Sequence, residues 1–151
     1  MKGLEQMYFV DREKIENILG YVEQQLSLFE EKKEWETAIE KAALERVCHT
    51  VIEGILDVGN AMIDGFIMRD PGSYEDIIDI LEDEKVITFE MSQGLKGVLL
   101  YRKMLVQNYT EIEHEDLQHA FHQQLETLKK FSPNVQQYLL NELGPVSAFR
   151  N

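Results

Sequence analysis

A chain of 151 residues suits one domain, and its length allows it to bury enough surface for a proper hydrophobic core. With 44% hydrophobic and 28% charged residues, the composition is typical of a globular protein and excludes an intrinsically disordered one. The 28 acidic and 15 basic residues give a formal net charge of −13, which repels phosphate backbones and argues against an autonomous reader of duplex DNA.

The single cysteine and the N-terminal segment bear on the cellular compartment. Cys48 cannot form a disulfide within the chain, which fits a reducing cytosol and a small buried apolar side chain. No segment approaches the roughly 20 apolar residues that span a bilayer. Residues 1–11 lack a signal-peptide core, because Glu5 and Asp11 flank too short an apolar run. We therefore expect a cytoplasmic protein without a membrane partner, folded as one domain over residues 1–151.

Two amphipathic helices are predicted in the first half of the chain. Asp11 is placed to cap the first helix, which ends near the charged run 30–34. Its apolar positions at helical spacing are Ile15, Ile18, Leu19, Val22, Leu26 and Phe29. The second, longer helix begins near Trp35 or Thr37. Its apolar side carries Leu44, Cys48, Val51, Ile52, Ile55, Val58, Met62 and Phe66. Small residues that would let a neighbouring helix approach closely are Ala38, Ala42, Gly54 and Gly59.

A turn separates these two helices from a shorter one. Asp70-Pro71-Gly72 breaks the pattern, and Ser73 is placed as the N-cap of a helix of about three turns. The apolar residues of this short helix are Tyr74, Ile77, Ile78 and Leu81. Thr88 can cap the next helix. The apolar stripe of that helix contains Leu95, Val98, Leu99, Leu105, Val106 and Tyr109.

The last helical stretch completes the predicted fold. Its apolar residues are Leu117, Phe121, Leu125, Leu128, Phe131, Val135, Tyr138 and Leu139. Ser132-Pro133 either kinks this helix or begins a new one, with serine as the cap and proline at the first position. Alternating strand-like segments are absent. The pattern therefore predicts an all-α fold, an up-and-down bundle of four long helices plus a short one.

Arg102 is the anomaly of the helix that follows Thr88. On a wheel of about 100° per residue, Arg102 falls in the middle of the apolar stripe, and Tyr109 lies two turns further on near the same line. An arginine on an apolar face is costly unless it is paired, or unless that face borders a cleft or a subunit interface. One interpretation is an arginine that reaches the edge of the bundle and bonds to Asp or Glu. The other is a functional site.

The residues after Arg102 resemble a motif of HepT-like proteins of the HEPN family, Arg-x4-His-x-Tyr near the end of such a helix. Arg102 and Tyr109 match the arginine and the tyrosine of this motif. Gln107 replaces the histidine, and Lys103 stands where a small polar residue is common. The order of a long second helix, a turn at residues 70–71, the motif helix and a final long helix extends the similarity over nearly the whole chain. The chain looks like the YutE-like branch of the family.

The resemblance implies a fold, an activity and a partner. The fold would be an HEPN-like bundle that forms a homodimer with the motif helices near the dimer axis. The activity would be that of the toxin component of HepT/MntA-type toxin–antitoxin systems, a metal-independent ribonuclease acting on RNA without a cofactor. The partner would be a minimal nucleotidyltransferase antitoxin that can transfer AMP to the motif tyrosine, here Tyr109.

The substitution at position 107 bears on that activity. Cleavage of RNA by attack of the 2′-hydroxyl needs a group that moves a proton and a cation that stabilises the charged phosphorane. Arg102 can fill the second role, with bidentate geometry on a phosphate. Gln107 cannot fill the first, because an amide neither accepts nor releases a proton near neutral pH. Losing general acid–base catalysis costs a factor of about 10²–10⁴, so we expect the ribonuclease activity to be weakened or lost.

Two other polar groups could carry chemistry. One face of the last helical stretch has spacings that could hold zinc, through Glu115, His119, His122 and Glu126. That face points away from the apolar side, so we expect a solvated surface and no metal. The second helix has a polar stripe formed by His49, Glu53, Asp57, Asn60 and Asp64. This stripe is either a solvent face or, as the resemblance implies, brings Glu53 and Asp57 near Arg102, where an acid could hold the arginine.

Two hypotheses of function follow. In the first, the protein is a dimeric, cytosolic, HepT-like toxin with a degenerate ribonuclease site. Arg102 is then the phosphate-binding cation, Gln107 the substituted base position and Tyr109 the AMP acceptor. In the alternative, a non-catalytic module uses the same cleft to bind a nucleotide or a partner helix. Gln107 favours the alternative, whereas the retained Arg102 and Tyr109 favour the first hypothesis.

Overall fold

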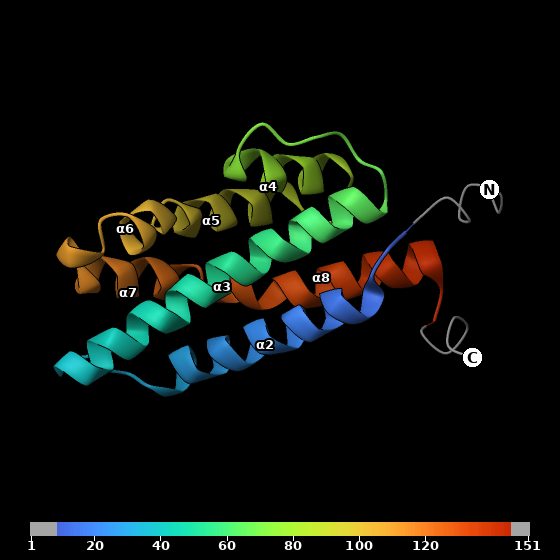
Figure 1. Ribbon diagram of the computed structural model, residues 1–151. Helices are drawn as coiled ribbons and strands as arrows, with labels where there is room; N and C mark the ends of the chain where they lie inside the picture. Colours follow the sequence, from blue (N-terminus) through green and yellow to red (C-terminus); the bar gives the residue numbers. More distant parts are fainter. Residues whose placement is uncertain (1–8, 146–151) are drawn as a thin grey trace.

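The computed structural model describes residues 9–145, and every regular element in that range is helical (Figure 1). In chain order the elements are α2 (Arg12–Glu31), α3 (Ala38–Gly65), α4 (Tyr74–Asp83), α5 (Phe89–Leu99), α6 (Arg102–Val106), the 3-10 helix η1 (Tyr109–Glu111), α7 (His114–Gln123) and α8 (Leu125–Leu143). The predicted all-α bundle is confirmed. Among the described residues, no helix is long and apolar enough to cross a membrane.

Side-chain caps fix where α2, α3, α4 and α5 begin. Asp11, Ser73 and Thr88 each accept a backbone N–H from the first turn of the helix that follows, at 3.0–3.1 Å, as predicted. Thr37 starts α3 with a capping box: its hydroxyl accepts the N–H of Glu40, and the Glu40 carboxylate accepts the N–H of Thr37. These bonds satisfy N–H groups that the first turn of a helix would leave without partners.

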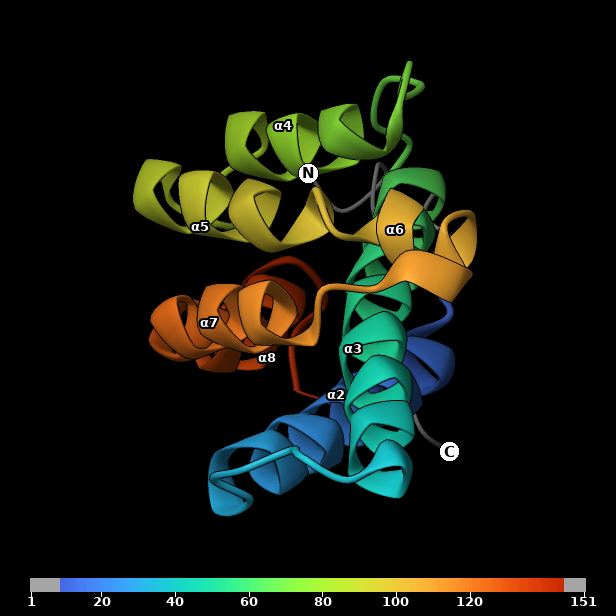
Figure 2. The same cartoon turned by 90° about the vertical axis from the view of Figure 1, so that its left-hand side faces the viewer.

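The central helix of the bundle is α3. It runs antiparallel to α2 and contacts α2, α4, α6 and α7, while α8 packs against α2 and α5 (Figures 1 and 2). Gly54 allows α2 to come close, because a Cβ at this position would lie 2.4 Å from Cγ2 of Val22. Gly59 does the same for α4, where the nearest atom, Cγ2 of Ile77, would lie at 2.5 Å. The predicted role of these two glycines in packing is confirmed.

The predicted helix from Thr88 to Tyr109 is not continuous, and this changes the geometry of the motif. α5 ends at Leu99, and the N–H of Tyr101 bonds to the carbonyl of Val98 at 3.0 Å, three residues back instead of four. A new helix, α6, starts at Arg102 and ends at Val106, so Tyr109 lies on η1. The wheel that aligned Tyr109 with Arg102 is therefore wrong, because it assumed one unbroken axis.

The C-terminal stretch also divides differently from the expectation. α7 ends at Gln123, and α8 begins at Leu125 and continues through Pro133 to Leu143. The sequence left two alternatives for Ser132-Pro133. The one in which a new helix begins there is wrong, because α8 is continuous through Pro133. The bundle thus combines the long helices α2, α3 and α8 with several shorter ones, in place of four long helices and one short one.

Candidate functional site

Arg102 is held by an acid on the central helix. Its Nε donates a hydrogen bond to Oε2 of Glu53 at 2.5 Å, and its Nη2 donates to Oε1 at 3.3 Å. The Arg102 side chain is 20% exposed and that of Glu53 is 33% exposed, so the pair lies at the edge of the bundle. The bonds to Glu53 raise the pKa of the Arg102 guanidinium above its usual value, and the side chain stays a cation.

An aromatic ring covers one face of this guanidinium. Cζ of Arg102 lies 4.1 Å from the centroid of the Tyr74 ring, which is within the range of a cation–π interaction. Tyr74 is the first residue of α4, directly after the capping residue Ser73. In the sequence, Tyr74 stands out only as an apolar residue of the short helix. No local pattern could have paired it with Arg102, because the two residues lie in different helices that only the tertiary fold brings together.

The guanidinium borders a shallow surface hollow between α4, α5 and α6. Its lining residues are Tyr74, Leu99, Leu100, Arg102, Lys103 and Gln107. An arginine carries five N–H donors, and Glu53 accepts two of those of Arg102. The Tyr74 side chain also interacts with the guanidinium, and three donors remain that Glu53 does not accept. They include both hydrogens of Nη1, so a fork remains that can bind two oxygens of a phosphate.

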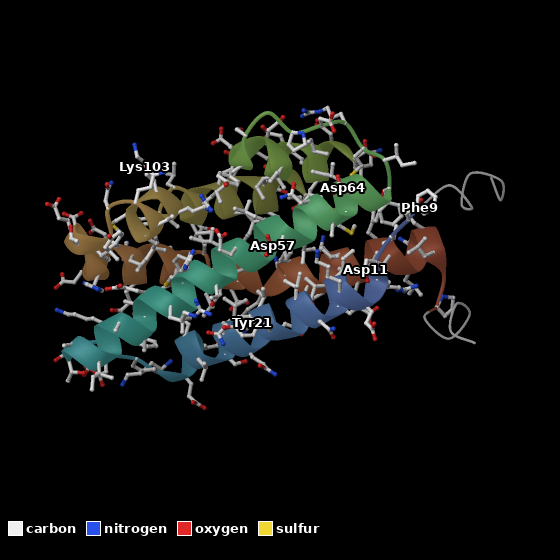
Figure 3. The ribbon with its side chains drawn as sticks, in the orientation of Figure 1. Phe9, Asp11, Tyr21, Asp57, Asp64 and Lys103 are labelled. Atoms are coloured by element: carbon white, nitrogen blue, oxygen red, sulfur yellow. The ribbon has the colours of Figure 1, made fainter. Side chains whose placement is uncertain are left out.

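Lys103 and Gln107 reach the hollow from α6 and its end. Lys103 is exposed and points away from the bundle on the outer side of α6 (Figure 3). Gln107 is the C-cap of α6, where its N–H bonds to the carbonyl of Lys103 at 2.8 Å, and its side chain is exposed. The structure thus brings Arg102, Lys103 and Gln107 to one hollow. The two cations can hold an anion in this arrangement, and the Gln107 amide cannot transfer a proton near neutral pH.

The other predicted site residues lie outside this hollow. Tyr109 is 65% exposed on η1 and is not among the lining residues. Asp57 lies one turn of α3 beyond Glu53 (Figure 3). It is exposed and forms no hydrogen bond or ion pair within the described range. Of the two acids expected near Arg102, only Glu53 contacts it.

The candidate zinc face lies on α7 and the start of α8. Glu115, His119, His122 and Glu126 are all exposed. Within residues 9–145, no three His, Cys, Asp or Glu side chains are grouped so that they could hold a metal ion. Glu115, His119 and His122 instead line a separate open hollow, together with residues of α2 and of the segment that follows it.

Comparisons with known proteins extend over most of the chain. The family described as Ribonuclease HepT-like matches residues 12–135. The Bacillus subtilis (strain 168) protein named Putative RNase YutE is 51% identical over 144 residues, which cover 95% of this chain and 100% of that protein. The solved structure of the cytosolic protein YutE from Bacillus subtilis has a TM-score of 0.91 at 51% identity, covering 94% of this chain and 99% of that one.

A more distant structure shares the fold alone. It is the crystal structure of a toxin-antitoxin with AMP-PNP, with a TM-score of 0.70 at 17% identity, covering 80% of this chain and 96% of that one. The HEPN-like helical bundle predicted from the sequence is thus confirmed by relatives at both levels of identity.

The pairing of Arg102 with Glu53 predicts a difference between two substitutions on α3. Glu53→Gln keeps a hydrogen-bond acceptor but removes the charge that faces Arg102, so the free energy of unfolding should fall by about 1 kcal/mol. Asp57→Asn is the matched control, one turn further along the helix, and should change it by less than about 0.5 kcal/mol. Urea denaturation at pH 7 measures both values. Equal stabilities of the two variants would contradict the structural role of the pair.

Proposed function

The chain belongs to the HepT-like ribonuclease family, and from this premise we propose that it is a toxin-type protein whose site binds an RNA phosphate through Arg102. The observation that carries the proposal is the state of that arginine. Two of its donors bond to Glu53, one face is covered by Tyr74, and the remaining donors border a hollow. A planar, permanently charged fork held in this way matches the geometry of a phosphate group.

The chemistry of RNA cleavage assigns different roles to the residues of the hollow. In the proposed reaction the 2′-oxygen of the substrate attacks the adjacent phosphorus, the bond to the 5′-oxygen breaks, and a proton moves from the first oxygen to the second. Arg102 stabilises the added negative charge on the phosphorane. Gln107 stands at the position of the family histidine and supplies no proton transfer. We therefore propose a ribonuclease site with weakened or lost activity, which needs neither a metal nor a cofactor.

Tyr109 is the proposed acceptor of AMP from a partner nucleotidyltransferase. Its exposure of 65% leaves the hydroxyl open to another protein, which supports this role. The distant relative solved as a toxin-antitoxin with AMP-PNP supports a partner of this kind. In the proposed transfer the Tyr109 oxygen attacks the α-phosphorus of ATP and pyrophosphate leaves. The phenolic proton passes to a base of the transferase.

A second copy of the chain is the proposed partner of the α5–α6 surface. Leu100 is 74% exposed at the junction of these helices, and Val106 is exposed at the end of α6. Large apolar side chains gathered beside a binding site favour a protein interface. We propose a homodimer related by a two-fold axis, with this surface as the interface. A cytoplasmic location is proposed with it, supported by the relative described as cytosolic.

The alternative function is a non-catalytic module that binds a nucleotide or a partner helix in the same hollow. Gln107 favours it, because binding an anion needs Arg102 but no proton transfer. A module that binds a nucleotide shares the phosphate-binding step with the ribonuclease and differs from it in whether cleavage follows.

Restoring a proton-transfer group should separate the two functions. The protein should cut single-stranded RNA slowly or not at all, and Gln107→His should raise the rate by at least about tenfold. Gln123→His, at the exposed end of α7, is the matched control and should change nothing. Gel analysis of labelled RNA measures the rates, and EDTA should leave them unchanged. Equal rates for wild type and Gln107→His would favour the non-catalytic module, and wild-type cleavage abolished by EDTA would refute the metal-independent mechanism.

The dimer is tested with charges placed on two exposed leucines. Multi-angle light scattering at micromolar concentration should give twice the chain mass for the wild type. Leu100→Glu should give a monomer, because a buried carboxylate without a partner opposes association. Leu28→Glu is the control, since Leu28 is also exposed but lies on α2, across the bundle from α6 (Figures 1 and 2). A wild-type monomer, or a dimer that tolerates Leu100→Glu, would contradict the proposed interface.

Modification of Tyr109 is tested by mass. After incubation with ATP and a nucleotidyltransferase encoded beside the gene, the intact mass should increase by whole AMP units. Tyr109→Phe should fold normally and show no such increment. Tyr21→Phe is the control, because Tyr21 is also exposed but lies on α2, and it should be modified like the wild type. An undiminished increment in Tyr109→Phe would refute the assignment of the acceptor.

A further inference from the structure

Two contacts hold the Arg102 guanidinium in different directions. Glu53 bonds to one edge of the planar group, which fixes its position within the plane. The Tyr74 ring lies against one face, with its centroid 4.1 Å from Cζ, which limits rotation of the plane about its bond to Glu53. An edge contact alone would leave the plane free to tilt, so Tyr74 supplies the constraint that Glu53 cannot.

Tyr74 is itself presented by a well-bonded turn. Ser73 caps α4 by accepting the N–H of Asp76 at 3.0 Å. The Asp76 carboxylate accepts two bonds from Arg69, at 2.7 and 2.8 Å, and one from the N–H of Gly72 at 2.8 Å. The bonds from Arg69 lower the pKa of Asp76 to about 2, so this acid is ionised at neutral pH and the turn is fully bonded. Because Tyr74 follows this turn directly, its ring is offered to Arg102 from a fixed backbone.

The exposure of Tyr74 argues against a role in the core. The residue is 50% exposed at the start of an amphipathic helix whose apolar side is formed by other residues. Its packing therefore contributes little to the burial of apolar surface. The ring instead contacts the guanidinium of Arg102, which borders the hollow.

We infer that Tyr74 is a positioning residue, which holds the plane of Arg102 so that its unpaired N–H groups face the hollow. The inference rests on the proposed function, in which those groups bind an RNA phosphate. The aromatic face carries this role, because the ring lies over the guanidinium and the Tyr74 hydroxyl contributes least to the raised pKa of Arg102. Tyr74→Phe should therefore behave like the wild type, and Tyr74→Leu, which keeps apolar volume without a π face, should not.

Binding of a non-cleavable RNA tests the role through a double-mutant cycle. The probe is a fluorescent single-stranded 2′-O-methyl oligonucleotide, and anisotropy is measured at one fixed salt concentration. Tyr74→Leu should weaken binding by about two- to fivefold, and Tyr74→Phe should stay within about twofold of the wild type. In an Arg102→Ala background, Tyr74→Leu should have no further effect, because Tyr74 acts through Arg102. The same loss in that background would overturn the inference and show that Tyr74 stacks directly on the RNA.

A second measurement does not depend on RNA. The Nε–H signal of Arg102 in a ¹H–¹⁵N spectrum, assigned by its loss in Arg102→Ala, reports how firmly the guanidinium is held. Tyr74→Leu should shift this signal and speed its exchange with water at least about threefold, whereas Tyr74→Phe should preserve it. Tyr21→Leu, a half-exposed tyrosine on α2 (Figure 3), controls for the loss of an aromatic residue as such, and thermal melts confirm that each variant folds.

The two measurements distinguish failure of the inference from failure of the proposed function. If the Arg102 Nε–H signal is unchanged in Tyr74→Leu, the positioning role is overturned, regardless of the RNA-binding result. No difference in RNA binding between wild type and Arg102→Ala would refute the phosphate-binding function. Arg102→Ala could leave RNA binding unchanged while the Arg102 signal still depended on the Tyr74 ring. Titration with inorganic phosphate would then decide whether Arg102 binds an anion. No change in its signal up to 50-fold more phosphate than protein, on the order of millimolar, would overturn the inference as stated.

Discussion

The bond between Arg102 and Glu53 ties the motif segment to the central helix, and the geometry of the hollow depends on it. α6 has only five residues, whereas isolated helices shorter than about 12 residues are marginal in water. Tertiary contacts must therefore hold it in place. Leu105 anchors α6 in the core, and Arg102 anchors it to α3 through Glu53. These two contacts leave Lys103 and Gln107 on the exposed side of the same short helix, where both can reach the hollow.

The negative charge of the whole protein is compatible with the proposed phosphate binding at the hollow. At physiological ionic strength, charges further away than about 8 Å are largely screened, so the groups nearest the hollow dominate its potential. There, Glu53 neutralises Arg102, and Lys103 forms no ion pair with any residue in the described range 9–145. The residues that line the hollow therefore include two cations, Arg102 and Lys103, and no acid, in a chain whose formal net charge is −13. Glu53 lowers the attraction of Arg102 for a phosphate, but it orients the N–H donors of Arg102 before a ligand binds.

The sequence predicts those features that depend on neighbouring residues. The caps at Asp11, Ser73 and Thr88 follow from local hydrogen bonding, and the long helices follow from apolar spacing. The break at Leu100 and Tyr101 could not be predicted in this way, because neither glycine nor proline marks it and the backbone of both residues stays right-handed. Tyr109 leaves the motif helix because α6 ends at Val106 and the backbone of Asn108 is not helical. Contact between Glu53 and Arg102 was expected from the resemblance and not from spacing, and the contact of Tyr74 with Arg102 is purely tertiary.

A site that keeps the phosphate-binding cation but has no proton-transferring group at position 107 can still bind RNA without cleaving it. A phosphodiester carries one negative charge, and the phosphorane formed by the attacking 2′-oxygen carries two, so Arg102 stabilises both states and the second more strongly. That second state is reached only when the attacking hydroxyl loses its proton, a step that Gln107 cannot assist. In the proposed function, the interaction with the intact RNA does not depend on this proton transfer. Arg102, held by Glu53 and Tyr74, therefore binds RNA there even where cleavage does not follow.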